Sequence, residues 1–74
     1  MSMNIFADSG HKVTVTEESL KNGYDYHSKT ASHYLTVGET YTVKYTNVGD
    51  WHTDVYLNEI PNIAFNSVNL IDLV

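Results

Sequence analysis

The segment 40–46 reads Thr-Tyr-Thr-Val-Lys-Tyr-Thr, so apolar or aromatic residues alternate with polar ones at every second position. In an extended chain successive side chains point to opposite faces, which would place Tyr41, Val43 and Tyr45 together on one face. β-branched and aromatic residues also favour a pleated, half-buried surface. This period of two predicts a β-strand with one buried face, and therefore a chain built mainly from sheet.

Two shorter segments, 12–16 and 53–57, show the same alternation. The residues predicted to face inward are Val13, Val15, Val55 and Leu57, and those predicted to face outward are Asp54 and Tyr56. The turn-rich run 46–50 predicts a hairpin between the second and third strands. The run 58–62 contains the only proline and predicts the next turn, where a missing backbone donor costs nothing.

One helical turn is predicted near the start of the chain. Thr16 would cap residues 17–21, which carry acids at their beginning and a lysine at their end, as the helix dipole favours. Gly23 would end the turn, because glycine adopts the left-handed conformation without strain. Residues 24–35 show no period, and we predict a long loop there.

The C-terminal part predicts a short strand at 63–65, a tight or 3₁₀ turn at 66–67 and a closing strand at 69–73. A chain of 74 residues is expected to form one domain, 1–74, with residues 1–11 as a candidate for a loosely ordered N-terminal segment. About five short strands in so small a chain must close on themselves or expose edges. The predicted fold class is therefore all-β, a small barrel of about five strands with one short helical turn.

The charge balance restricts the partners. Nine acids against four lysines, with no arginine, give a formal net charge of −5. Nucleic-acid binding depends on Lys and Arg neutralising phosphates, so we expect no direct nucleic acid contact and no binding to anionic membranes. An acidic surface favours a protein partner with a basic surface. The absence of cysteine and of a long apolar run favours a cytoplasmic protein.

Several short motifs together resemble the Src homology 3 pattern over residues 24–70. They are Tyr24-Asp25-Tyr26, Leu35-x-x-Gly38-Glu39-x-Tyr41-x-Val43, Gly49-Asp50-Trp51 and Asn66-Ser67-Val68-Asn69-Leu70. The resemblance implies a Src-homology-3-like barrel that docks proline-rich peptides on aromatic residues. Tyr24, Tyr26 and Trp51 match three of those aromatic positions. The chain departs from the pattern in the final turn, which has Asn66 and Asn69 in place of proline and tyrosine, and in the long loop, which has no acid.

The C-terminal half also looks like small bacterial and phage proteins of unassigned function. The matching motifs are Thr36-Val37-Gly38, Tyr41-x-Val43, Trp51-His52-Thr53-x-Val55-x-Leu57 and Phe65-Asn66-Ser67-Val68. This resemblance implies a small acidic protein of a phage or mobile element. Such a protein would modulate or inhibit a host protein by occupying its surface.

Catalytic and metal-binding patterns are weak in this sequence. No two of the four histidines are three or four residues apart and no cysteine is present, so we predict no metal and no cofactor. Ser67 and His52 lack a third catalytic group and an oxyanion motif, and a chain this short has little room for a sugar-sized cleft between carboxylates. We expect a protein that is not an enzyme.

The predicted function is a protein-interaction module with aromatic anchors and acids that steer a basic partner. Its predicted binding residues are Tyr24, Tyr26, Asp50, Trp51, His52 and Asp54. Trp51 could instead be a lid over the core, and the sequence leaves both readings open. Two other functions also stay open: a metal- or ligand-binding protein that uses His27, His33 and His52, and a structural subunit of a larger homo-oligomer. A homodimer formed through residues 12–16 or 69–74 is a further hypothesis.

Overall fold

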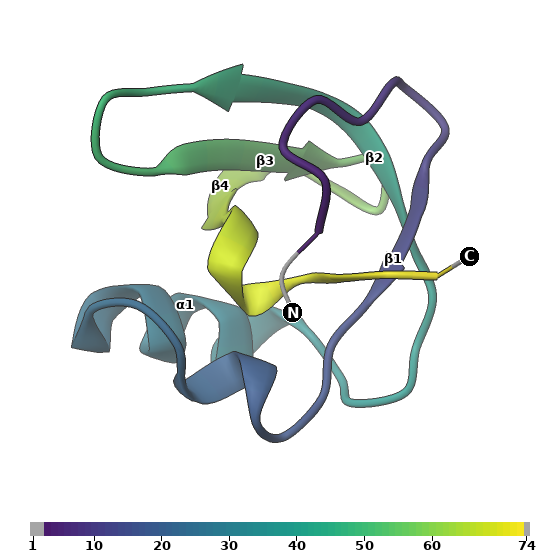
Figure 1. Ribbon diagram of the computed structural model, residues 1–74. Helices are drawn as coiled ribbons and strands as arrows, with labels where there is room; N and C mark the ends of the chain where they lie inside the picture. Colours follow the sequence, from purple (N-terminus) through teal and green to yellow (C-terminus); the bar gives the residue numbers. More distant parts are fainter. Residues whose placement is uncertain (1–2, 74) are drawn as a thin grey trace.

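The computed structural model describes residues 3–73. Its strands form one antiparallel sheet in the order β4-β3-β2-β1-β5 (Figure 1). They are β1 (Lys12–Thr14), β2 (Tyr41–Val48), β3 (Thr53–Leu57), β4 (Ile60–Asn66) and β5 (Ile71–Asp72). The mostly-β prediction is confirmed. Closure into a barrel is not, because β4 and β5 are the two edges and no pairing within residues 3–73 joins them.

β2 is the long strand that connects the two parts of the sheet. It pairs with β1 near its beginning and with β3 along the rest of its length. The pairing with β3 shifts register between Val43 and Tyr45, where β2 contains one more residue than its partner. Such a bulge reverses which side chains face inward. Tyr41 and Val43 are buried as predicted, but Tyr45 is 48% exposed, and its predicted inward position is wrong.

The other inward predictions are confirmed, and they define the core. Val13, Val15, Val55 and Leu57 are fully or almost fully buried. They pack in one cluster that also contains Met3, Leu35, Phe65 and Leu70. The backbone N–H of Met3 donates to the carbonyl of Leu70 at 2.8 Å, which holds the start of the described chain against its end.

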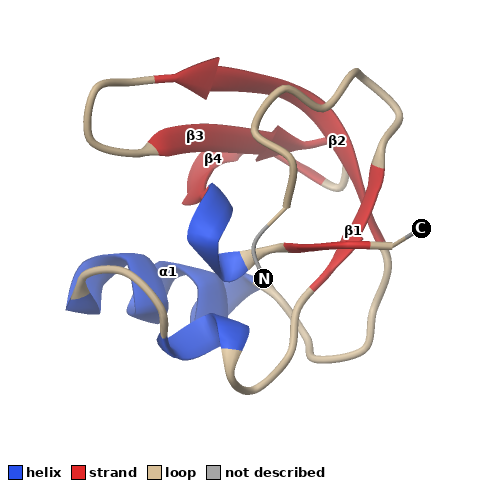
Figure 2. Ribbon diagram, in the orientation of Figure 1, coloured by secondary structure: helices blue, strands red, loops and turns tan. Residues whose placement is uncertain are grey.

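A helix, α1 (Asp25–Tyr34), replaces the loop predicted over residues 24–35, and that prediction is wrong. Only His27 and Ala31, which are four residues apart, are buried on this helix. Two buried positions are too few to produce an apolar stripe, so the sequence shows no helical period. Figure 2 shows α1 on the side of the C-terminal 3₁₀ turn opposite the β2–β3 hairpin.

Two 3₁₀ turns confirm the helical turn predicted near the start and the 3₁₀ turn predicted near the end of the chain. The first, η1 (Ser19–Lys21), follows Thr16, whose hydroxyl accepts from the Ser19 backbone N–H at 3.0 Å. Gly23 then has a positive φ of 79° and lets the chain enter α1. The second, η2 (Ser67–Asn69), precedes β5. The turn predicted over 58–62 is wrong at residues 60–62, which belong to β4, and the closing strand predicted over 69–73 is limited to Ile71–Asp72. Among the described residues, no helix has the length and apolar character needed to cross a bilayer.

β1 is an inner strand, because β2 and β5 pair with its two sides. Pairing of residues 12–14 with a second copy is therefore blocked by neighbours that are already present. β5 remains at the sheet edge, with Ile71 partly buried and Leu73 exposed beyond it. The part of the hypothetical dimer segment at residue 74 lies outside the described residues.

Candidate functional site

Trp51 lies in the turn of the β2–β3 hairpin, and 94% of its surface is exposed. The turn is tight: the Gly49 backbone N–H donates to the His52 carbonyl oxygen at 3.0 Å. A Cβ at Gly49 would approach that same oxygen to 2.8 Å, so glycine is required for this geometry. Trp51 is therefore not a core lid, and the hairpin presents its ring to solvent. Asp50, next to it, is also exposed.

Tyr24 and Tyr26 lie at the beginning of α1. Both are exposed, Tyr24 to 69%, and their rings stack with centroids 6.1 Å apart and planes 8° from parallel. The Tyr26 ring also lies 4.0 Å from the imidazole of His27, measured between centroids. The helix that the sequence did not predict therefore places two of the predicted aromatic residues side by side.

His27 connects this end of α1 to the sheet. It is almost fully buried, and its Nδ1 accepts from the Tyr24 backbone N–H at 3.3 Å and lies 3.1 Å from Nδ2 of Asn66. Because both neighbours are donors, Nδ1 is unprotonated and the neutral ring carries its proton on Nε2. The His52 ring is 5.2 Å away, and His52 Nε2 bonds Oδ1 of Asp54 at 3.0 Å.

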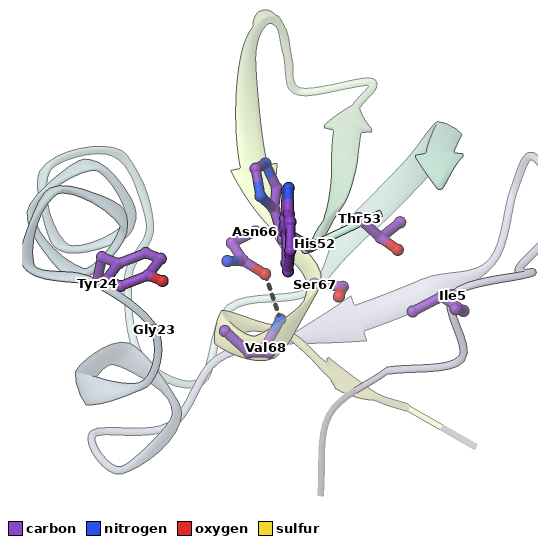
Figure 3. A pocket seen from close by; sticks show the side chains of 9 residues that line it. Ile5, Gly23, Tyr24, His52, Thr53, Asn66, Ser67 and Val68 are labelled. Carbon is purple, nitrogen blue, oxygen red and sulfur yellow. Dashed lines mark hydrogen bonds between the residues drawn. The ribbon is translucent and has the colours of Figure 1, made fainter. Parts of the chain in front are cut away.

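Between α1, the hairpin and η2 lies a pocket of about 450 Å³ (Figure 3). Its lining residues are Ile5, Gly23, Tyr24, Trp51, His52, Thr53, Asn66, Ser67 and Val68. In Figure 3, Tyr24 stands across the pocket from His52, with Asn66 between them. The Asn66 side chain also accepts from the Val68 backbone N–H at 3.1 Å, which fixes η2 at the base of the pocket.

Of the six predicted binding residues, Tyr24, Trp51 and His52 line this pocket. Tyr26, Asp50 and Asp54 are not among its lining residues, although Tyr26 stacks on Tyr24 and Asp54 bonds His52. The sequence did not point to Ile5, Gly23, His27, Thr53, Asn66 or Ser67 as members of this site. A signal for His27 would have required the helix to be recognised, because only its helical neighbours bring it to Asn66.

Within residues 3–73, no three His, Cys, Asp or Glu side chains converge in a way that could hold a metal ion. His27 and His52 are neighbours, whereas His33 lies near the other end of α1 and packs edge-on against Tyr34. Ser67 and His52 line the same pocket, but no hydrogen bond joins them among the described residues.

Burial of the imidazole lowers the pKa of His27 below its usual value of about 6.5, and the nearby His52 lowers it further, while Asp54 acts in the opposite direction. The folded chain thus favours neutral His27, whereas the unfolded chain protonates it near pH 6.5. This residue's contribution to stability is complete above about pH 6.5 and is lost as the pH falls from there through the folded pKa.

We therefore expect the wild type to unfold at a lower urea concentration at pH 5.5 than at pH 7.5. The variant His27→Asn should show a smaller decrease in this urea midpoint. The Asn oxygen keeps an acceptor near the position of Nδ1 but does not titrate. Circular dichroism during urea denaturation measures both midpoints. His33→Gln, at an exposed helical histidine, is the matched control and should keep the wild-type fall. An equal fall in wild type and His27→Asn would contradict the assignment.

The fold and this pocket together define a small, mostly-β protein with an aromatic-walled cavity between a hairpin and a helix. A family model described as Bacteriophage T4 protein Y07B matches residues 4–72, and the chain belongs to that family. The expectation of a small phage protein is confirmed, while the comparisons give the Src homology 3 resemblance no support. No curated protein and no solved structure matches the chain.

Proposed function

We propose that this phage protein is a non-enzymatic interaction module that binds a host protein with a basic surface and modulates or inhibits it. The observation that carries the proposal is the exposure of Trp51, 94%, beside a pocket whose opposite side holds the exposed Tyr24. Tryptophan and tyrosine are enriched among residues that dominate binding energy, and an exposed Trp has no role in the core of the free chain.

The charge of the chain supports the same proposal. The net charge is −5, and Asp50 and Asp54 lie beside the hairpin residues that line the pocket. Acids around an aromatic centre accelerate encounter with a basic partner and disfavour acidic ones. The aromatic residues would supply most of the affinity, because charges at the rim of an interface contribute mainly to the association rate.

Trp51→Ala is expected to weaken the complex by roughly 30-fold or more, since hot-spot truncations cost about 2 kcal/mol or more. The tagged full chain would first capture a partner from a lysate of the host bacterium. Isothermal titration with the purified partner would then give the dissociation constants of wild type and variant. Circular dichroism should show both folded, because the Trp51 side chain is exposed.

Tyr45→Ala is the matched control. Like Trp51, Tyr45 is an exposed aromatic residue. It lies in β2, stacks on Tyr56 and does not line the pocket. It should leave the dissociation constant within about twofold. Equal losses for the two variants, or a stoichiometric partner that binds Trp51→Ala as tightly as wild type, would refute the proposed face. The homo-oligomer alternative predicts a large assembly of the isolated chain, which sedimentation velocity detects.

A further inference from the structure

Resting on the function proposed above, we propose that the pocket between Tyr24 and Trp51 receives the side chain of a tyrosine from the partner, with basic residues beside it in the partner's sequence. The pocket volume of about 450 Å³ falls within the range of roughly 300–1,000 Å³ that is usual for ligand pockets.

The walls of the pocket favour an aromatic ring. Tyr24 and Trp51 present exposed ring surface, and Ile5 and Val68 add aliphatic surface. Aromatic rings pack against one another in offset or edge-on arrangements that are worth about 0.5–1.5 kcal/mol beyond the area that they bury. A tyrosine or tryptophan also loses little conformational entropy on binding, because it has only two side-chain torsions.

The floor of the pocket favours a ring that carries a hydroxyl group. Thr53 and Ser67 line the pocket although each is only 4% exposed, so only a small part of each residue is accessible there. Neither hydroxyl has a hydrogen-bond partner among the described residues. The amide of Asn66, in contrast, is already engaged by His27 and by the Val68 N–H. A phenolic hydroxyl can both donate and accept, so it could satisfy a floor of this kind.

The charges around the pocket argue against a cationic or anionic side chain inside it. None of the lining residues is Asp, Glu, Lys or Arg, and the lining His52 is bonded to Asp54. A guanidinium entering the pocket would lose water without meeting a free carboxylate. A phosphate or carboxylate would face a chain of net charge −5. A neutral side chain therefore fits the interior.

Each of the two aromatic wall residues has an acidic residue next to it in the sequence. Asp25 follows Tyr24 at the first position of α1, and Asp50 precedes Trp51 in the hairpin turn. Both are exposed, so they would face the partner outside the pocket. This distribution matches a tyrosine flanked by lysine or arginine and does not match an isolated aromatic residue.

The test titrates the ¹⁵N-labelled full chain with three probes, the Nα-acetyl methylamides of tyrosine, phenylalanine and arginine, and follows ¹H–¹⁵N spectra. We expect shifts at Gly23, Thr53, Ser67 and Val68. The tyrosine probe should bind about fivefold or more tightly than the phenylalanine probe, the factor expected for one net hydrogen bond. Arginine should bind most weakly. Equal binding of tyrosine and phenylalanine, tighter binding of arginine, or no shift at these residues would each overturn the inference.

Two variants distinguish the contribution of the hydroxyl groups to binding from that of the aromatic walls. Ser67→Ala should bring the tyrosine probe toward the affinity of the phenylalanine probe and leave phenylalanine binding unchanged. Trp51→Ala should weaken both, and Tyr45→Ala, the control, should weaken neither. A Ser67→Ala chain that keeps the full preference for tyrosine would overturn the assigned role of the hydroxyl floor.

The proposed function and this inference fail in different ways. A partner whose capture depends on Trp51, together with no binding of the tyrosine probe, would refute the inference and leave the proposed function standing. Selective binding of the tyrosine probe, together with no host protein captured, would refute the proposed function and leave the ligand preference of the pocket standing.

Discussion

Asn69→Asp is expected to destabilise the protein by about 3–5 kcal/mol at pH 7, the cost of leaving an unpaired charge in a buried site. The Asn69 side chain is 0% exposed. Its Nδ2 donates to the carbonyls of Ser19 at 2.8 Å and Asn22 at 3.0 Å, which ties η1 to η2. Aspartate would place a carboxylate oxygen against these two carbonyl oxygens. Domains are stable by only about 5–15 kcal/mol, so much of the variant should unfold.

The pH dependence of this variant distinguishes charge from lost hydrogen bonds. Burial without a partner raises the pKa of an aspartate, so Asn69→Asp should recover part of its stability as the pH falls toward 4.5. Asn69→Ala carries no charge and should show no such recovery relative to wild type. The exposed Asn62→Asp is the matched control and should change the urea midpoint little. An Asn69→Asp chain as stable as Asn62→Asp at pH 7 would contradict the assigned role.

Phe65→Ala is expected to cost about 3–5 kcal/mol, the usual range for removing a buried phenylalanine ring. Phe65 is one of the largest fully buried side chains and meets the Tyr34 ring edge-on, with centroids 6.2 Å apart. It therefore joins β4 to the last residue of α1. Because Tyr24 and Tyr26 lie at the other end of α1, loosening of the helix should weaken the candidate site.

The measurement for Phe65→Ala is the free energy of unfolding from urea denaturation followed by circular dichroism. Phe65→Leu keeps most of the volume and should lose roughly 1.5 kcal/mol or less if the core repacks. The exposed Tyr45→Ala should cost much less than Phe65→Ala. A loss below about 1 kcal/mol in Phe65→Ala would show that the ring is not packed as described.

The strands could be predicted because alternation is a local property of the chain. Val13, Val55 and Leu57 are buried where the period of two places them. The same rule failed at Tyr45, since one extra residue at the bulge turns the following side chain to the other face. Nothing in the segment 40–46 marks that bulge, because its position depends on pairing with β3.

The helix shows the opposite situation. The segment 25–34 contains Ser, Thr and His residues of low helix propensity, and it has too few apolar positions to show a period. It is helical because α1 packs against β4 and the two 3₁₀ turns, and this packing buries His27 and Ala31. That support comes from residues distant in the chain, such as Asn66, whose amide meets His27.

Some features of the candidate site could likewise be predicted from the sequence, and others could not. Trp51, Tyr24 and Asp50 could be proposed from residue type, charge and turn position, which are all local. Whether Trp51 was a lid or an anchor could not, because exposure depends on which elements pack around the hairpin.

The sequence by itself therefore determined a small acidic chain of short strands with aromatic residues at its turns, since alternation, turn residues and net charge act over a few neighbours. Tertiary structure alone decided that residues 25–34 are helical and that Tyr45 faces solvent. It also decided that Thr53 and Ser67 line one pocket together with Trp51 and Tyr24. The physical reason is that each of these features is stabilised by contacts between segments far apart in the chain, which no local pattern encodes.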